Sequence, residues 1–241
     1  MAASAPAADV RSGSARAPRG GGRPGLPLTQ SAQQPPAAGG VVTMKHLLLL
    51  GCGAHARSLI DLIETGVQWS IHGLLGLPEQ VGTSVLGYPV IGTDVDLPSL
   101  RGACPGGVLA IGQLPDPKPR QGLAALLEQL GFHCPVLISP YAVVVSRHAR
   151  LDAGTMVAHG AIVNAGAVVG SHCILNSHAL IEHDAQLSDH CHVSIGALLN
   201  GDVSLGSGSF IGSGAMLREC LKMTAGTLIS AGKRVMGWPL S

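Results

Sequence analysis

The sequence predicts a small α/β domain followed by a left-handed parallel β-helix built on a six-residue repeat. Three observations support this fold class. Aliphatic residues recur at every sixth position through the C-terminal half, and a glycine-rich turn follows the apolar run that ends at Leu50. The chain is 46% hydrophobic but only 2% aromatic, so its core must be filled by aliphatic residues. A period of six fits neither an α-helix nor a plain strand and is typical of a solenoid.

The first 43 residues differ in composition from the rest of the chain. Residues 1–43 are rich in Ala, Gly, Pro, Ser and Arg, with Asp9 as the only acidic residue and no aromatic residue. Such a segment cannot bury enough apolar surface to offset its ordering entropy, so we expect a disordered extension. Its Arg-rich, acid-poor character also resembles a transit peptide. Translation that starts at Met44 is an alternative that the sequence leaves open.

Residues 44–135 have the pattern of an α/β domain. Lys45–Leu50 is a short buried strand, and the turn Gly51–His55 leads into a helix. The apolar side of this helix carries Leu59, Ile60, Leu62 and Ile63. Val108–Ile111 indicates a later strand, and Gly122–Leu130 a helix that a glycine ends. Strands that alternate with helices predict a short parallel sheet with right-handed crossovers.

Residues 136–241 carry the six-residue repeat. Its aliphatic positions are Val145, Leu151, Val157, Val163, Val169, Leu175, Ile181, Leu187, Val193, Leu199, Leu205, Ile211, Leu217, Met223, Ile229 and Val235. A small residue stands two positions earlier at Ala149, Thr155, Ala161, Ala167, Cys173, Ala179, Ala185, Cys191, Ala197, Ser209 and Ala215. We interpret the repeat as short strands, three to a coil, in a triangular prism. The aliphatic residue fills the interior, the small residue fits beneath the turn, and a Gly or Asn directly after the aliphatic residue takes the corner.

The same frame assigns the cysteines and two of the histidines. Cys173 and Cys191 are eighteen residues apart, so they should stack inside the prism as packing residues. His172 and His190, also eighteen apart, should form a solvated ladder on its surface.

A histidine beside an aspartate is the candidate catalytic feature. His183 lies two positions after the core residue Ile181, so His183 and Asp184 should lie outside the core near a corner. His192, on the next coil, should also point outward. A carboxylate can hold one imidazole nitrogen protonated and leave the other free to accept a proton, which makes His183 a candidate general base. The same pair also occurs on ordinary solvated surfaces, and spacing alone leaves both readings open.

The turn Gly51–His55 is a candidate ligand site. Its small residues let the backbone approach a ligand, and the following helix N-terminus can face phosphate. The last glycine of a dinucleotide fingerprint is missing, and no acidic residue is suitably placed about 20 positions on. We therefore expect a phosphate or nucleotide-sugar site rather than a nicotinamide site.

From Lys45 to about Pro239 the chain resembles the NeuD/PglD-type sugar O- and N-acyltransferases. These proteins join a small Rossmann-like domain to a left-handed β-helix of the hexapeptide-repeat class. Four segments carry the resemblance, in the family's order: Gly51–Ala56, Leu86–Gly92, Ala110–Gly112 and the coils from Val163 to Ala197.

The resemblance implies a function. It implies direct transfer of an acetyl group from acetyl-CoA to an amino group or hydroxyl of a sugar during surface glycan biosynthesis, and in this family the sugar is linked to a nucleotide. His183 would be the general base and Asp184 its polarising partner. Acetyl-CoA would lie in a groove between neighbouring subunits of a homotrimer. The implied cofactor-binding residues are His192, Gly201, Ser213 and Ala231, and the implied substrate-binding residues are Gly53, Ala54, His55 and Gly112.

Besides a changed C-terminal motif at residues 237–240, the chain departs from the family pattern in two places. The family often has an acidic pair after its second strand, whereas Gly73–Pro78 holds no carboxylate. The resemblance therefore does not extend to recognition of uridine. The family's GNxxR loop is replaced by Gly112–Leu114 and a Pro-rich insertion before Arg120.

Two functions of other classes stay open. One is a metal hydrolyase of the γ-carbonic anhydrase kind, in which His178, His183 and a histidine of a neighbouring subunit hold the metal. The other is a trimeric scaffold without turnover. For the acyltransferase we expect no metal.

The composition of the chain limits the binding partners and the cellular compartment that we expect. The net charge of +1 gives no electrostatic case for nucleic acid or acidic lipid. No stretch reaches the roughly 18 to 20 apolar residues that span a bilayer. Six cysteines without CxxC spacing indicate reduced thiols. We therefore expect a cytoplasmic protein.

Overall fold

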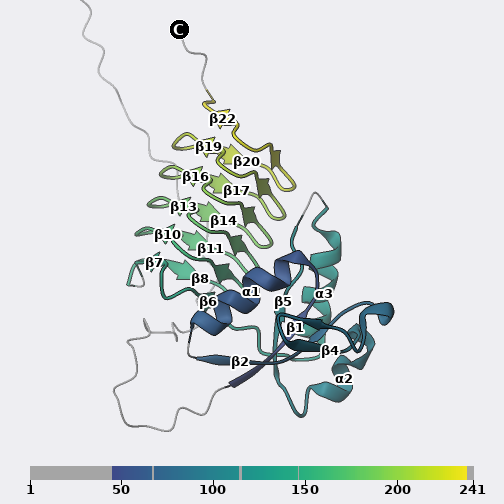
Figure 1. The fold of residues 1–241 in the computed structure, drawn as a ribbon. Coiled ribbons are helices and arrows are strands. Elements are labelled where there is room, and N and C mark those ends of the chain that lie inside the picture. The colour runs from purple at the N-terminus through teal and green to yellow at the C-terminus, as the bar shows by residue number, and fades with distance from the viewer. Residues whose placement is uncertain (1–44, 67, 114–115, 146, 238–241) are drawn as a thin grey trace, which may run out of the picture. The chain divides into compact units, whose positions relative to one another are not determined.

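The computed structural model describes residues 45–66, 68–113, 116–145 and 147–237. The predicted extension 1–43 lies outside these residues. A mixed α/β sheet comes first, and three sheets of short parallel strands follow (Figure 1). This confirms the predicted fold class, a Rossmann-like part followed by a left-handed β-helix. No helix in the described ranges is long and apolar enough to cross a membrane.

The first sheet has the strand order β3-β4-β2-β1-β5. The central strand β1 (Lys45–Leu50) pairs in parallel with β2 (Trp69–Leu75) and β5 (Gly106–Leu109). β4 (Tyr88–Gly92) is parallel to β2, whereas β3 (Ser84–Val85) is antiparallel to β4. The chain thus adds strands on one side of β1 and then returns to its other side with β5.

A two-residue hairpin turn makes the sheet mixed at its edge. Leu86 and Gly87 both have left-handed backbone, with φ of 48° and 87°, which is the conformation of a tight β-hairpin turn. The prediction of a wholly parallel sheet is therefore wrong at β3.

Two long helices cover the sheet. They are α1 (Ala54–Thr65) and α3 (Lys118–Gln129), and the shorter helices are η1 (Pro78–Gln80), η2 (Asp94–Asp96) and α2 (Leu97–Leu100). The predicted apolar side of α1 is buried, as expected. α3 begins four residues before the predicted start because Pro119 in its first turn is well suited to a helix start. β5 ends at Leu109, two residues before the predicted end.

The repeat forms a prism with three faces, which we number in the order that the chain visits them in each coil. Face 1 consists of β6 (Leu137–Ile138), β9 (Met156–Val157), β12 (Ile174–Leu175), β15 (His192–Val193), β18 (Phe210–Ile211) and β21 (Leu228–Ile229). Face 2 consists of β7 (Val143–Val144), β10 (Ile162–Val163), β13 (Leu180–Ile181), β16 (Leu198–Leu199), β19 (Met216–Leu217) and β22 (Arg234–Val235). Face 3 consists of β8 (Arg150–Leu151), β11 (Val168–Val169), β14 (Gln186–Leu187), β17 (Ser204–Leu205) and β20 (Lys222–Met223). Edges 1–2, 2–3 and 3–1 are the turns between these faces.

The prism interior follows the predicted frame with one exception. Every predicted aliphatic position from Leu151 to Val235 lies in, or packs against, one continuous core. Cys173 and Cys191 are fully buried in that core, as predicted. The prediction for Val145 is wrong. Val144 is the inward residue and pairs with Val163, because the turn between β7 and β8 holds one residue more than the later turns.

The turn residue is also displaced from the predicted corner. From Leu151 to Ile229, left-handed backbone occurs three positions after each aliphatic residue, not one. In the prism it is found at Gly154, Gly160, Gly166, His172, His178, Asp184, His190, Gly196, Asp202, Gly208, Gly214, Cys220, Gly226 and Gly232. Glycine adopts this conformation freely, whereas Asp and His tolerate it at some cost. The non-glycine exceptions gather in the coils that hold the candidate site.

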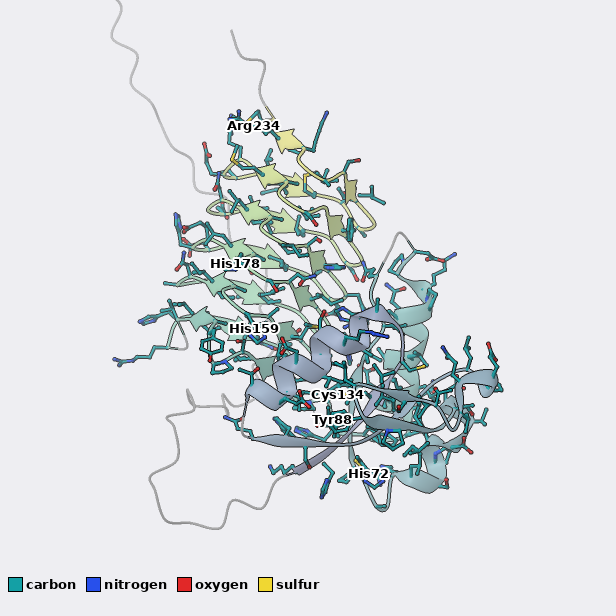
Figure 2. All side chains as sticks on the ribbon, viewed as in Figure 1. His72, Tyr88, Cys134, His159, His178 and Arg234 are labelled. Atoms are coloured by element: carbon teal, nitrogen blue, oxygen red, sulfur yellow. The ribbon has the colours of Figure 1, made fainter. Side chains whose placement is uncertain are left out.

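The α/β part packs against face 1. Met156 and Ile174, on the outer side of this face, share one apolar cluster with Leu47 and Leu59. Figure 2 labels His159, whose Nε2 atom lies 2.9 Å from Oδ2 of Asp61 in α1. These contacts cover face 1 in the first coils, whereas Arg234 lies at the other end of the prism (Figure 2).

Candidate functional site

The predicted His-Asp pair is assembled on edge 2–3. Nδ1 of His183 lies 3.0 Å from Oδ2 of Asp184, and both side chains are exposed, as predicted. The left-handed backbone of Asp184 has φ of 60°. The backbone N–H of His183 donates to Oε2 of Glu182 at 3.0 Å. The imidazole is thus held at Nδ1, and its Nε2 atom is the one left for a substrate proton.

Gly201 lies directly beside the His183 ring, one coil farther along. A Cβ atom added at Gly201 would lie 2.6 Å from both Cε1 and Nε2 of that ring. Contacts below 3 Å require something to shift, so the ring can occupy this position only because residue 201 has no side chain. Gly201, predicted to line the cofactor path, therefore belongs to the immediate surroundings of His183.

Acidic neighbours raise the pKa of His183. The largest cause is the hydrogen bond to Asp184, and the charges of Asp184, Glu182 and Asp202 act in the same direction. Each of these groups stabilises the imidazolium form. The neutral ring is consequently a stronger base than a free histidine, which suits an acceptor of a substrate proton.

His192 points away from the prism core, as predicted, but it is buried rather than at the surface. It is only 6% exposed. Phe210 packs edge-to-face against it with ring centroids 5.0 Å apart, and its Nδ1 atom lies 3.3 Å from the carbonyl oxygen of Gln113. Burial is the main cause that lowers its pKa to about 4. The sequence frame placed His192 on the correct side of the strand but could not show that the α/β part covers it.

His55 lies close to both Gly112 and His192. Burial, followed by the charges of Arg120 and His192, lowers the pKa of His55 to about 4. A Cβ atom added at Gly112 would lie 3.7 Å from Cβ of His55. The structure thus brings together two predicted substrate residues and one predicted cofactor residue. The buried Nε2 atoms of His55 and His192 have no hydrogen-bond partner in the described part of the chain.

The prediction of a solvated ladder of His172 and His190 is wrong. The two rings do stack, with centroids 5.4 Å apart and 7° between their planes. His172 is only 2% exposed, however, and its Nε2 atom lies 3.5 Å from Glu128 of α3. Helix α3 therefore covers this part of edge 3–1, and burial is the main cause that lowers the pKa of His172 to about 4.

Arg120 is a buried residue whose importance the sequence analysis missed. Its guanidinium is 1% exposed and donates to the carbonyl oxygens of Leu109, Ile111 and His172 at 3.3, 2.6 and 3.3 Å. Among the described residues no carboxylate pairs with it. Arg120 joins the end of β5 to the prism, and its charge lowers the pKa of His55 and of His192. The sequence did contain a signal for this role, since Arg120 is a charged residue on the otherwise apolar face of α3.

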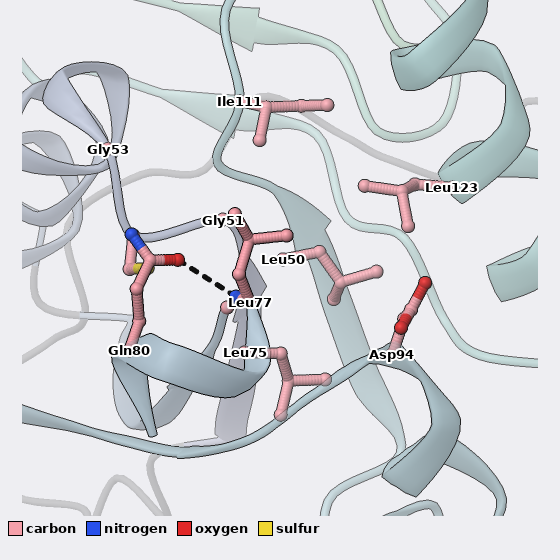
Figure 3. Close-up of a pocket in the computed structure, with 11 residues that line it drawn as sticks. Leu50, Gly51, Gly53, Leu75, Leu77, Gln80, Asp94, Ile111 and Leu123 are labelled. Carbon is pink, nitrogen blue, oxygen red and sulfur yellow. Dashed lines mark hydrogen bonds between the residues drawn. The ribbon is translucent and has the colours of Figure 1, made fainter. Parts of the chain in front are cut away.

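A cavity of about 320 Å³ lies at the carboxyl ends of β1, β2 and β5 (Figure 3). It is lined by Leu50, Gly51, Cys52, Gly53, Leu75, Gly76, Leu77, Gln80, Asp94, Ile111 and Leu123. Of the predicted substrate residues, Gly53 lines this cavity, whereas Ala54 and His55 do not. Gln80 and Asp94 are polar lining residues that the sequence analysis did not select, although each follows closely after a strand.

The remaining predicted cofactor residues lie on a different edge from His183. Ser213 and Ala231 are exposed on edge 1–2, and Oγ of Ser213 lies 2.9 Å from Oγ of Ser194. Edge 2–3, with His183 and Gly201, is opposite face 1, which the α/β part covers. One chain therefore does not bring His183 together with Ser213, Ala231 or the cavity.

The described residues contain no group of three or more His, Cys, Asp or Glu side chains that could hold a metal ion. His178, labelled in Figure 2, lies on edge 1–2, whereas His183 lies on edge 2–3. The two histidines of the metal hypothesis therefore stand on different edges of one chain.

Comparisons with known proteins agree with this geometry. The family model of the PglD N-terminal domain matches residues 46–125. The chain is 30% identical to PerB from Caulobacter crescentus in complex with CoA and GDP-perosamine, with a TM-score of 0.74 over 82% of this chain and 91% of that one. A histidine variant of perosamine N-acetyltransferase from the same organism gives the same values. The acetyltransferase domain of PglB from Neisseria gonorrhoeae in complex with acetyl coenzyme A is 31% identical, with a TM-score of 0.71 over 80% and 93%. No curated protein sequence matches the chain.

Proposed function

The chain belongs to the PglD-type sugar acetyltransferases, and from this premise we propose that it transfers the acetyl group of acetyl-CoA to an amino sugar carried by a nucleotide. The α/β part would hold the nucleotide sugar, and the prism would carry out the transfer. The two relatives in complexes support this assignment, since one binds acetyl coenzyme A and the other CoA with GDP-perosamine. A role in surface glycan biosynthesis fits the same substrates.

The single observation that carries the proposed mechanism is the exposed His183–Asp184 pair beside Gly201. The sugar amine attacks the carbonyl carbon of the thioester, forming a C–N bond while the C–S bond breaks. Nε2 of His183 accepts the proton that the amine loses, and the thiolate of CoA is protonated in turn. Asp184 keeps the Nδ1 proton in place and stabilises the imidazolium. A general base of this kind contributes about 10²–10⁴-fold, and no acyl-enzyme is required.

A homotrimer would complete the site. The outer positions of face 2 are apolar over five coils: Val143, Ile162, Leu180, Leu198 and Met216. Those of face 3 are mostly polar: Arg150, Val168, Gln186, Ser204 and Lys222. A continuous apolar column on a surface is typical of a protein contact. We therefore place face 2 toward a three-fold axis.

This arrangement supports the assignment of the cofactor residues. With face 2 turned inward, edge 2–3 of one copy lies next to edge 1–2 of the following copy. His183 and Gly201 of one protomer would then face Ser213 and Ala231 of its partner, and acetyl-CoA would occupy the groove between them. The α/β part of the partner also contacts edge 1–2, through Asp61 and His159. His192 of the same partner, on face 1 next to edge 1–2, would also contact acetyl-CoA. Free thiols at all six cysteines fit a reducing, cytoplasmic compartment.

The test uses the full chain, acetyl-CoA and GDP-perosamine, with release of free CoA thiol as the measurement. His183→Asn should lower kcat by about 10²–10⁴-fold, whereas His72→Asn, which changes an exposed histidine of β2 in the α/β part, should leave it unchanged. Full turnover by the His183 variant would exclude His183 as the base. Absence of acetyl-CoA binding in calorimetry would favour the non-catalytic scaffold. Stoichiometric zinc in the purified protein would favour the metal hydrolyase.

A further inference from the structure

We propose that the cavity at the carboxyl ends of β1, β2 and β5 selects a guanine base, and that Asp94 is the residue that reads it. This inference rests on the proposed function, because it takes the cavity as the site of the nucleotide carried by the sugar. The acceptor would accordingly be a GDP-linked sugar.

The topology of the sheet places a ligand here. Strand β2 lies on one side of β1 and β5 on the other, so the chain reverses direction across the sheet at β1. Ligands of open α/β sheets bind at this reversal, outside the carboxyl ends of the strands. Leu50, Leu75 and Ile111, at the ends of these strands or just after them, line the cavity together with Leu123 of α3. Apolar side chains of this kind suit the flat faces of a base.

Two polar side chains of the cavity differ in their hydrogen bonding: one can donate, and the other can only accept. Oε1 of Gln80 accepts the N–H of Leu77 at 2.8 Å, so the amide NH₂ of Gln80 is free to donate. The carboxylate of Asp94 receives no hydrogen bond and no ion pair within the described residues. Asp96, two residues later, differs, since its Oδ2 atom accepts the backbone N–H of Thr93 at 2.8 Å. Figure 3 shows Gln80 and Asp94 on opposite sides of the leucines that line the cavity.

A carboxylate discriminates among the bases. Guanine presents two adjacent donors, N1–H and the N2 amino group, which match the two oxygens of a carboxylate as a bidentate pair. Uracil presents one N–H between two carbonyl oxygens, which a carboxylate repels. Adenine and cytosine each present an amino group beside a ring nitrogen that can only accept. Guanine also carries the acceptors O6 and N7, which suit the donor at Gln80.

The position of Asp94 distinguishes base recognition from ribose recognition. In dinucleotide-binding sheets the acidic residue that holds the ribose hydroxyls follows the second strand. Here β2 is followed by Gly76 and Leu77, neither of which carries a carboxylate. Asp94 follows β4 instead, one strand farther from β1. Figure 3 shows Asp94 across the cavity from Gly53, which belongs to the turn after β1.

Calorimetry of the full chain with GDP, UDP and ADP tests the inference without any acyl donor. We expect GDP to bind at least about tenfold more tightly than UDP or ADP. Asp94→Asn should weaken GDP binding by about 10- to 100-fold and change UDP and ADP by less than about twofold. Asp94→Ser provides a second variant, and thermal melting verifies that both are folded.

Glu79→Gln is the matched control. Burial, and more weakly the charge of Glu79, raise the pKa of the Cys52 thiol in the cavity wall, so Glu79 is close to the cavity, but it does not line it. This variant removes the same charge and should leave GDP binding unchanged.

Equal binding of the three nucleotides, or tighter binding of UDP, would overturn the guanine assignment alone. An equal loss of all three in Asp94→Asn would assign Asp94 to the ribose and would also overturn it. Absence of binding by every nucleotide would contradict the nucleotide-sugar function as well, so the two failures are distinguishable.

Discussion

Nδ1 of His183 lies 3.0 Å from Oδ2 of Asp184, the residue that follows it in the chain. In an extended strand consecutive side chains point to opposite faces, so neighbours do not ordinarily meet in this way. The left-handed backbone of Asp184, with φ of 60°, turns its carboxylate back toward the imidazole. The geometry of the turn thus creates the pair.

Asp184→Asn should shift the pH dependence of catalysis. In the proposed mechanism His183 must be neutral to act as the general base, so activity should fall as the pH drops through its pKa. Asp184 is the main cause that raises this pKa, so its replacement should move the acid limb of kcat/KM to lower pH. The plateau rate should fall about tenfold or more, because a weaker base accepts the proton. Asn retains the left-handed backbone.

The control for this pH profile is Asp202→Asn. Asp202 also has left-handed backbone but affects His183 only through its charge, and more weakly. A smaller shift in the same direction is expected. An acid limb that does not move in Asp184→Asn would show that another group limits the rate.

Gly201→Ala should displace the imidazole of His183. The new methyl group would lie 2.6 Å from Nε2 of His183, and the exposed ring is free to move away. We expect kcat to fall by about 10²-fold, since small displacements of a reacting group have effects of this size, with little change in the melting temperature. Gly122→Ala, where a Cβ atom meets nothing within 4 Å, is the control. Wild-type kcat in Gly201→Ala would place the working position of the ring elsewhere.

Leu198→Arg should break the proposed trimer. Leu198 is half-buried on the apolar outer side of face 2, and a charge there would be buried without a partner at the three-fold axis. Light scattering should report a monomer, with loss of turnover because His183 no longer faces the partner. Ser204→Arg, at the equivalent position of face 3, should remain trimeric. A trimeric Leu198→Arg would mean that another surface forms the contact.

Arg120→Met should destabilise the fold and change neighbouring titrations. It leaves the carbonyl oxygens of Leu109, Ile111 and His172 without their donor, a loss of about 3 kcal/mol in the free energy of unfolding. Urea denaturation measures this loss. Removal of the cation should also raise the pKa of His55, which Arg120 lowers, as NMR titration would show. Unchanged stability would mean that water replaces the guanidinium.

The stability of the protein should fall as the pH drops from about 6.5 toward 4. Burial lowers the folded-state pKa of His172 and His192 from 6.5 to about 4, so the unfolded chain binds protons first in this range. Each residue contributes up to about 3 kcal/mol to the dependence. His172→Asn, which suits the left-handed backbone there, should flatten the curve of melting temperature against pH. An unchanged curve would show that His172 is already protonated in the fold.

The sequence predicts the prism better than it predicts the site. The core positions follow from a local period, so Leu151 to Val235 and the inward cysteines could be placed by counting. The turn position could not, because the glycines that mark it alternate with His and Asp in the middle coils. The burial of His192 and His172 depends on Gln113 and on α3, which are distant in sequence, and no local pattern contains that information. His183 and Asp184 could be placed because nothing in their own chain covers them.

The eighteen-residue coil also places equivalent turn positions at a constant spacing along each edge of the prism. Gly201 and Asp202 occupy, one coil farther along, the positions of His183 and Asp184, and Asp202 already has left-handed backbone with φ of 57°. The triple substitution His183→Gly, Gly201→His and Glu219→Gly would move the imidazole–carboxylate pair by one strand spacing, about 4.8 Å, without altering a single core residue. A solenoid of this kind therefore lets protein engineers change the distance between acyl donor and acceptor in steps of one coil.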